Sequence, residues 1–195
     1  MISEFLSRGT TSSIQASVQT AGVGQQFLRF HLMPDTTALL PVHQMTEVLT
    51  MASSEIVPIP GMPAWVMGVH NWRGEILWMV DLGYLLGLTP LYQQATSGST
   101  YTAIVVRSAQ QAQGRQQAGR QNTNGKMLGL LVNRVEDMEW CDPDLIQSPP
   151  EATVAPELVP FLRGYWLKPN GEILVVLDGN SIIARMPQPE ASASS

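Results

Sequence analysis

The segment Gly74-Glu75-Ile76-Leu77-Trp78-Met79-Val80-Asp81 is the most informative in the sequence, because its pattern returns later in the chain. Residues 171–174 again read Gly-Glu-Ile-Leu, and Asp178 follows them at the spacing at which Asp81 follows the first copy. A segment that recurs with its internal spacing intact indicates a repeated structural unit. The sequence therefore predicts two related halves.

The match extends upstream of both copies. Pro63 and Gly68 correspond to Pro160 and Gly164, and each copy is preceded by a proline-containing stretch, at residues 56–60 and 146–150. The same order of strands, prolines, glycine, strand and aspartate thus occurs twice. Each half alone offers a marginal core, so we expect the two to pack together. The join between them predicts a groove, which is a natural place for a partner.

The segments between the turn signals have the length and composition of short strands. Residues 27–32 alternate apolar and polar side chains, and residues 76–80 and 173–177 are continuous apolar runs that indicate buried strands. Residues 38–42 and 45–49 are two further short strands. Helical turns are expected at residues 63–67, 156–162, 82–86 and 181–185, the last two capped by the preceding aspartates Asp81 and Asp178. The pattern predicts an all-β fold in which each half forms a small antiparallel barrel with a few helical turns.

These patterns also predict domain boundaries. Residues 1–26 and 186–195 are read as flexible tails, and residues 27–185 as the folded part, with one subdomain over about 27–95 and a second over about 96–185. Residues 108–125 are rich in Gln, Gly, Ala, Arg and Asn and lie between two apolar runs. They predict a long mobile loop within a hairpin formed by residues 101–106 and 127–132.

Composition excludes several classes of function. Of the 195 residues, 44% are apolar and 14% are charged, and the net charge of −5 opposes binding to nucleic acid or to anionic membrane. One cysteine, Cys141, rules out an intramolecular disulfide. A signal peptide and an apolar run of membrane-spanning length are not evident, so we expect a cytoplasmic protein without direct membrane insertion.

No enzyme or cofactor motif is apparent. The three histidines lack metal-site spacing, and Cys141 has no second cysteine with which to hold zinc. Neither a serine-nucleophile elbow nor a glycine-rich phosphate loop occurs. We read Cys141 as a half-buried structural thiol, and Asp81 and Asp178 as helix caps rather than paired catalytic acids. We therefore expect no catalytic residue, no metal and no cofactor.

Two features suggest a contact surface. Trp65, Trp72 and Trp78 are close in sequence; they either pack in the core or provide an exposed aromatic anchor, and a tight turn at residues 71–74 would expose Trp72. Glu47 and Arg73 form a pair if their strands are neighbours, or else are two unrelated surface charges.

Residues 66–82 resemble the signature of the CheW-like family, with Gly68, Asn71, Arg73, Gly74 and Asp81 at its fixed positions. Residues 27–30 resemble the opening strand of that family, and residues 45–49 resemble its next strand with the fixed glutamate, Glu47. Residues 129–135 resemble a strand of the second half, with Asn133 in place of the usual aspartate. The resemblance covers residues 27–185.

The resemblance implies two SH3-like five-stranded β-barrels joined around a hydrophobic core, without catalytic activity or cofactor. It implies an adaptor that links chemoreceptors to a CheA-type histidine kinase, contacting the receptor's cytoplasmic tip and the kinase's regulatory domain. Such a protein would be cytoplasmic and recruited to membrane receptor arrays. Position within the family pattern assigns partner binding to Met45, Glu47, Gly68, Asn71, Trp72, Arg73 and Val135.

The chain also departs from the family pattern. Trp72 stands where leucine is common, and the 108–125 loop and the N-terminal segment are longer than usual. These departures leave open a paralogue that serves a type IV pilus or phototaxis-type pathway. Two other classes stay open: a β-barrel module that binds nucleic acid, a small ligand or another partner, and an enzyme whose catalytic cluster is assembled from distant residues.

Overall fold

The structure, a computed structural model, describes residues 24–94, 99–108, 127–148 and 154–186. The predicted N-terminal tail, the 108–125 loop and the C-terminal tail lie outside these residues, apart from their inner ends. At the N-terminal inner end, the first strand already begins at Gln25, two residues before the predicted boundary.

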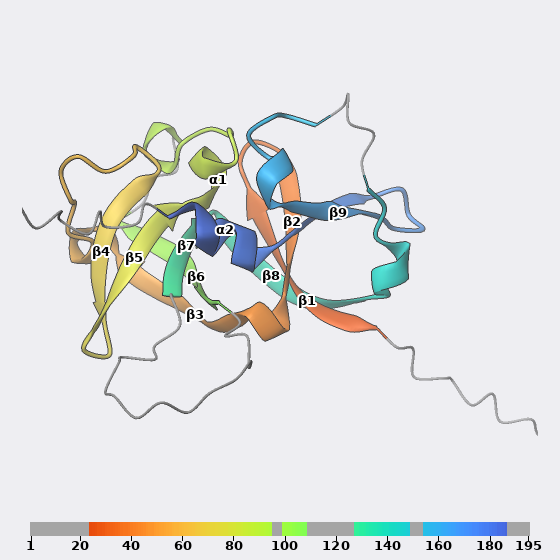
Figure 1. The fold of residues 1–195 in the computed structure, drawn as a ribbon, viewed down its shortest axis with the longest axis horizontal. Helices are drawn as coiled ribbons and strands as arrows, with labels where there is room; N and C mark the ends of the chain where they lie inside the picture. The colour runs from red at the N-terminus through yellow and green to blue at the C-terminus, as the bar shows by residue number, and fades with distance from the viewer. Residues whose placement is uncertain (1–23, 95–98, 109–126, 149–153, 187–195) are drawn as a thin grey trace, which may run out of the picture.

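Ten strands of the described residues form two five-stranded sheets, which lie side by side (Figure 1). Barrel A has the order β8 (Arg134–Cys141), β1 (Gln25–Leu32), β2 (Thr36–Pro41), β10 (Ile173–Leu177), β9 (Leu162–Leu167). Barrel B has the order β3 (Met45–Ala52), β6 (Thr100–Arg107), β7 (Met127–Val132), β5 (Glu75–Asp81), β4 (Val66–Trp72).

The two sheets have the same arrangement, which agrees with the predicted duplication. Strands β1–β5 form one copy and β6–β10 the other, and matching strands occupy matching places in the two sheets. The predicted hairpin of residues 101–106 and 127–132 is confirmed, since β6 and β7 pair antiparallel.

The predicted subdomains 27–95 and 96–185 are wrong as structural units, because the copies exchange their first hairpins. The β1–β2 hairpin pairs with β8, β9 and β10, whereas the β6–β7 hairpin pairs with β3, β4 and β5. The exchange uses one parallel pair in each barrel, β2 with β10 and β5 with β7, so the barrels are not wholly antiparallel as expected. A repeat shows which segments are alike but not which copies pair.

The repeated aspartates cap short helices, as predicted. Asp81 accepts a hydrogen bond from the Tyr84 backbone N–H at 3.0 Å before α1 (Leu82–Leu85). Asp178 accepts one from the Asn180 backbone N–H at 3.1 Å before α2 (Gly179–Arg185). Five 3₁₀ turns lie in the described segments: η1 (Val42–Gln44), η2 (Ser53–Glu55), η3 (Leu91–Gln93), η4 (Pro143–Leu145) and η6 (Val159–Phe161). The helical turn predicted at residues 63–67 is wrong, because β4 begins at Val66.

Three apolar clusters hold the fold together. Barrel B has an interior built around Met79 and Leu131, and barrel A one built around Phe27 and Leu39. The largest cluster, here called the junction core, combines side chains of both barrels and both helices, and α2 lies between the barrels (Figure 1). Because each sheet buries one face in its barrel and the other in the junction core, the described residues form one body.

The chain crosses between the barrels at two points, each tied by an amide side chain. At η1, Gln44 donates to Asp178 Oδ1 at 2.8 Å and accepts from the Gly179 backbone N–H at 2.7 Å. Between β7 and β8, Asn133 accepts from the Met33 backbone N–H at 2.9 Å and donates to Gln94. These bonds join the two copies of the repeat.

Candidate partner-binding site

The β4–β5 hairpin presents Arg73 at its tip. Arg73 has φ of 53° and Gly74 has φ of 84°, so two consecutive residues adopt the left-handed conformation of a type I′ turn. Asn71 fixes the turn by accepting a hydrogen bond from the Gly74 backbone N–H at 3.0 Å. The sequence Asn-Trp-Arg-Gly thus specifies a tight hairpin that places the Arg73 side chain in solvent.

Glu47 joins the two edges of barrel B. It lies on β3, one edge strand of the sheet, while Trp72 ends β4, the other edge strand. Glu47 Oε2 lies 2.7 Å from Arg73 Nη2, and Glu47 Oε1 accepts a hydrogen bond from the Trp72 indole N–H. Of the two open interpretations of Glu47 and Arg73, the structure shows the pair and not two unrelated charges, although the two strands meet through closure of the barrel and not as neighbours in the ladder.

Trp72, Arg73 and Glu47 differ in the exposure of their side chains, and this difference indicates a different role for each. Trp72 is 8% exposed and packs in the barrel B interior with Leu77 and Met79, so of its two open interpretations the structure shows core packing and not the exposed anchor. The turn carries only Arg73 and Gly74 outward, because Trp72 is still a strand residue. The side chain of Arg73 is 67% exposed and that of Glu47 is 24% exposed. Arg73 therefore contacts solvent, while Trp72 donates to the Glu47 carboxylate from the barrel interior and holds it in place.

Gly68 allows two backbone segments to approach each other closely. Its φ is 141°, and a Cβ at this position would lie 2.2 Å from the Val57 carbonyl oxygen. Val57 and Val69 form a β-bridge, so the 57–58 segment lies directly against β4. Gly68 permits this close approach, and any side chain there would displace the strand.

Met45 and Val135 occupy matching places at the two crossings. Each begins its strand or lies one residue inside it, each is half-buried, and each packs against the junction core. Met45 pairs with Val106 and Val135 pairs with Phe30, and a register shift follows both residues. The structure thus brings Glu47, Trp72 and Arg73 together and sets Met45 and Val135 at the junction; the groove there stays a prediction.

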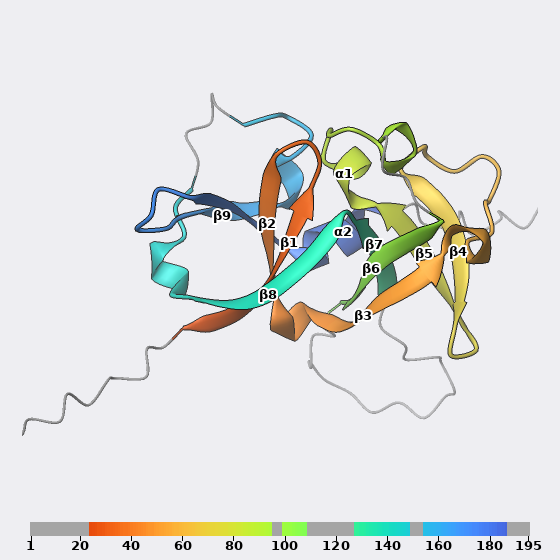
Figure 2. The same cartoon turned by 180° about the vertical axis from the view of Figure 1, so that it is seen from behind.

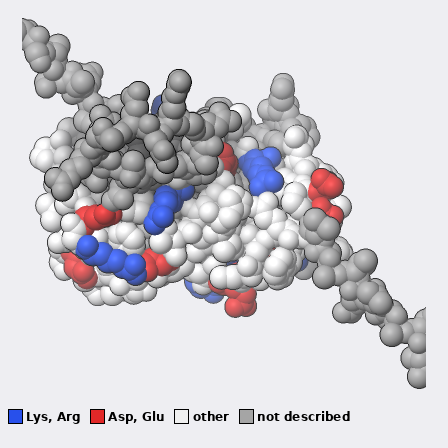
Figure 3. Space-filling model, turned by 60° about the horizontal axis from the view of Figure 1, so that its bottom comes forward, with Lys and Arg blue, Asp and Glu red and all other residues white. Residues whose placement is uncertain are grey.

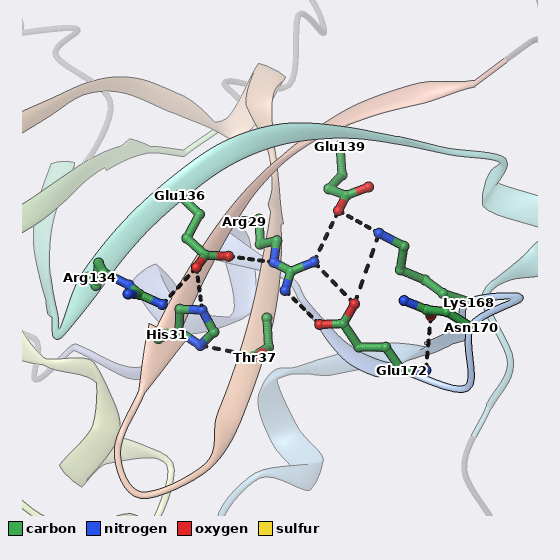
Figure 4. A network of polar contacts seen from close by, with 9 residues as sticks. All are labelled: Arg29, His31, Thr37, Arg134, Glu136, Glu139, Lys168, Asn170 and Glu172. Atoms are coloured by element: carbon green, nitrogen blue, oxygen red, sulfur yellow. Dashed lines mark hydrogen bonds and ion pairs between the residues drawn. The ribbon is translucent and has the colours of Figure 1, made fainter.

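A second group of polar side chains was not foreseen from the sequence. Figure 4 shows Arg29 among Glu136, Glu139 and Glu172, with His31, Arg134 and Lys168 around them. We call these seven residues the Arg29 cluster. The available signal was that Arg29 and His31 share one face of β1 with the buried Phe27. Three carboxylates and three permanent cations balance here.

On the face of the described residues that Figure 3 shows, the charges do not gather into one large field. In the view of Figure 3, acidic and basic side chains form small separate groups within a mostly neutral surface. Such a surface suits short-range contact with a protein better than long-range steering of a charged ligand.

The groups that might have suggested chemistry have structural surroundings. Burial raises the pKa of the Cys141 thiol to about 11, with Asp142 adding to the effect, so this thiol is protonated at neutral pH. Cys141 is 1% exposed, which is more buried than expected. Among the described residues, no group of three or more His, Cys, Asp or Glu side chains has the arrangement of a metal site. In the same residues, no helix is long and apolar enough to cross a membrane.

Comparison with known proteins matches these observations. The family model described as "CheW-like domain" matches residues 26–186. A curated relative, "Probable chemotaxis protein CheW" of Rhizobium etli, is 30% identical over 93 residues, which are 48% of this chain and 48% of that protein. The match thus spans about half the length of each protein.

A solved structure supports the architecture. The crystal structure of scaffolding protein TtCheW from Thermoanaerobacter tengcongensis superposes with a TM-score of 0.60 at 21% identity, covering 79% of this chain and 88% of that one. At this identity the likeness concerns the fold. With the two five-stranded sheets, it confirms the expected all-β fold of two SH3-like barrels related by duplication.

Proposed function

Because this chain belongs to the family of CheW-like domains, we propose that it is a non-enzymatic scaffold that links chemoreceptors to a CheA-type histidine kinase. The observation that carries the proposal is the closed edge of barrel B. There, the family motif builds a rigid hairpin whose exposed Arg73 is aimed by Glu47, which is itself held by Trp72.

The proposed receptor surface comprises Met45, Glu47, Gly68, Arg73 and Val135, with Asn71 and Trp72 shaping it. Arg73 supplies an exposed guanidinium with several donors, suited to carbonyl and carboxylate oxygens on an α-helical receptor tip. Met45 and Val135 add half-buried apolar contact area on the junction core. An arginine beside apolar area is a common composition of protein–protein hot spots.

The proposed setting is the cytoplasmic side of membrane receptor arrays, reached through the partners and not by insertion into the bilayer. The regulatory domain of the kinase is the second partner. Neither a metal nor a cofactor enters this proposal, and binding alone supplies the activity. The scaffold would transmit receptor motion to the kinase as a stiff connector.

The first test is calorimetric titration of the purified protein with the regulatory domain of a CheA-type kinase from the same cell. We expect micromolar binding that persists at about 0.15 M salt, where exposed charges more than about 8 Å apart are largely screened. Absence of binding to every such kinase of the cell would overturn the adaptor assignment. Titrating the kinases of flagellar and pilus-type pathways separately identifies which output the scaffold serves.

The second test addresses the receptor surface. Arg73→Glu is expected to fold normally and to lose binding to the receptor's cytoplasmic helical hairpin, since it places a carboxylate beside Glu47. Arg163→Glu is the matched control, because Arg163 is an exposed arginine on β9 of the other barrel. Unchanged binding in a folded Arg73→Glu variant would remove Arg73 from the site.

A further inference from the structure

Strand β8 contains a bulge that decides which way Val135 faces. On β1, Leu28 and Phe30 pair with Met138 and Val135, so two residues of β8, Glu136 and Asp137, lie opposite one residue, Arg29. An extra residue of this kind bends a strand and re-aims its side chains. The bulge of β8 therefore lies directly across from Arg29.

The alternation of β8 changes at this bulge. Glu139 contacts Arg29 and Cys141 lies in the barrel A interior, so a regular strand would also turn residues 137 and 135 toward that interior. Instead Glu136 faces Arg29, Asp137 is exposed, and Val135 packs against the junction core. Without the extra residue, Val135 would face barrel A and not the junction.

The Arg29 guanidinium contacts both sides of the bulge. Its Nε lies 2.6 Å from Glu136 Oε2, and its Nη1 lies 3.1 Å from Glu139 Oε1. Arg29 Nε and His31 Nε2 are buried and have no well-aligned hydrogen bond. Charge attraction holds Arg29 Nε against Glu136 at 2.6 Å, and His31 Nε2 lies 2.7 Å from the same carboxylate. Arg134 adds a third contact to Glu136 at 2.7 Å.

The same guanidinium also reaches the β9–β10 hairpin. Arg29 Nη2 lies 2.6 Å from Glu172 Oε1, and Lys168 Nζ lies 2.7 Å from Glu139 Oε1 (Figure 4). No ladder pairs β8 with β9 in the described sheet, where they are the two edge strands. Side-chain ion pairs thus hold β8 against the hairpin where backbone hydrogen bonds do not.

Barrel B has a bulge at the matching place without a charge at the position of Arg29. There Thr46 and Glu47 of β3 lie opposite Val105, and contacts of Glu47 with Trp72 and Arg73 tie the bulge to the β4–β5 hairpin. Arg29 pairs with Leu39, which lies beside Val176, and Val105 pairs with Gly129, which lies beside Met79. Because Met79 and Val176 are matching residues of the repeat, Val105 is the counterpart of Arg29. Val105 is fully buried among apolar side chains. The ion pairs of Arg29 are only partly buried, with side chains 18–28% exposed, and such a pair taken singly contributes little to stability. Stability alone therefore does not account for the charged cluster.

We propose that Arg29 is a positioning residue that holds the β8 bulge and thereby turns Val135 toward the partner-binding face of the junction. The inference rests on the proposed function for its partner, and on the geometry of β8 for the rest. Arg29 does not touch the partner. Arg29 acts through its contacts with β8, and its contact with Glu172 of the β9–β10 hairpin holds the guanidinium in place.

The test compares Arg29→Met, Arg29→Lys and the matched control Arg163→Met, which removes a guanidinium from the surface of the same barrel. Amide hydrogen exchange and the contacts of the Val135 methyl groups are followed by NMR, and binding to a receptor helical hairpin by calorimetry. We expect exchange at residues 135–139 to accelerate about tenfold or more in Arg29→Met, since charge-assisted hydrogen bonds are lost. Exchange in β6 and β7 should stay as in the wild type.

Arg29→Lys separates positioning from charge. A lysine keeps the positive charge but has one ammonium group, which cannot contact three carboxylates in the fork geometry of Arg29. We expect an intermediate acceleration and a partial loss of the contacts between Val135 and the junction core. If Arg29→Met does not fold, Glu136→Gln is measured instead, with a smaller acceleration expected at the same residues.

Two results would overturn the inference. One is unchanged exchange at residues 135–139 in a folded Arg29→Met or Glu136→Gln variant. The other is accelerated exchange at residues 135–139 together with receptor binding at wild-type affinity. This result would show that the orientation of Val135 does not affect partner binding. If the wild-type protein itself fails to bind the receptor hairpin, the proposed function fails, and exchange and methyl contacts alone decide whether Arg29 positions Val135.

Discussion

Replacing Asp81 by alanine is expected to destabilise the protein more than the same change at its repeat partner, Asp178. Asp81 is fully buried, and its two oxygens accept hydrogen bonds from the Tyr84 backbone N–H at 3.0 Å and the Leu91 backbone N–H at 2.8 Å. The first bond caps α1, and the second fixes the start of η3. Asp178 has partners in Asn180, Ser181 and Gln44 but is more accessible.

The magnitudes follow from these contacts. Losing the cap lowers the free energy of unfolding by about 1 kcal/mol. Leaving the buried N–H of Leu91 without an acceptor adds about 1–3 kcal/mol. Asp81→Ala should therefore lower the free energy of unfolding by about 2–4 kcal/mol. For Asp178→Ala we expect about 1–2 kcal/mol, because water replaces part of what is lost.

The two aspartates should also respond oppositely to pH. Burial raises the pKa of Asp81, although hydrogen bonds from the backbone N–H groups of Leu91, Tyr84 and Gly83 act to lower it. Because the pKa of Asp81 is higher in the folded protein than in the unfolded chain, protonation of this carboxyl favours folding as the pH falls. At Asp178, desolvation raises the pKa, but hydrogen bonds from Ser181 and Gln44 outweigh it and lower the pKa overall. The stability that Asp178 contributes is present above its unfolded pKa of about 3.9 and is lost as the pH falls through the lower folded value.

The assay is urea unfolding of the wild type, both alanine variants and both asparagine variants between about pH 3 and pH 7, a range that spans the ordinary aspartate pKa. As the pH falls, the stability difference between wild type and Asp178→Asn should narrow, and that between wild type and Asp81→Asn should widen. Equal slopes at the two sites, or a larger loss in Asp178→Ala than in Asp81→Ala, would contradict the different burial and hydrogen bonding assigned to the two carboxylates.

Three further predictions use the same unfolding measurement or a simple reagent. Trp72→Ala should lower the free energy of unfolding by about 3–5 kcal/mol, whereas Arg73→Ala should lower it by at most about 1 kcal/mol, because only the tryptophan is buried. The Cys141 thiol, with a pKa of about 11, should resist a thiol reagent at pH 8 until the protein unfolds; rapid labelling of the native protein would contradict its burial. Asn133→Asp should lower the free energy of unfolding by about 1–3 kcal/mol, since an aspartate cannot donate a hydrogen bond to Gln94. An unchanged free energy of unfolding in this variant would show that the bond does not contribute to stability.

The sequence predicted the parts of this protein that depend on local pattern. The repeat around Asp81 and Asp178 predicted two matching strand–helix units, and apolar runs predicted β5 and β10. The Glu47–Arg73 pair was one of two open interpretations, and the structure decides for it. Trp72 was also left open between the core and an exposed anchor, and the structure places it in the core. The turn motif could not decide this, because it shows where the chain reverses but not which flanking residue still points into the barrel.

The features that the sequence did not predict depend on contacts between distant segments. In the exchange, the first hairpin of each copy pairs with strands of the other copy. Because the repeated motifs are the same in both copies, they do not indicate whether a hairpin pairs within its own copy or with the other. The Arg29 cluster joins residues separated by up to 143 positions, so no local pattern contains it. Charged residues at inward positions of a strand were the available signal, and they indicate that a partner of opposite charge exists without naming it.

The exchange of hairpins bears directly on the proposed role as a stiff connector. Two independently folded barrels could rotate about their interface, as domains joined by a linker do. Here each barrel contains strands from both copies, and Figure 2 shows β8 running from the junction across barrel A. A rotation of one barrel against the other would have to break the parallel strand pairs β2–β10 and β5–β7, or the hydrogen bonds of Gln44 and Asn133 at the two crossings. Since Met45 and Val135 lie at these crossings, a force applied there acts on both barrels through covalent strands.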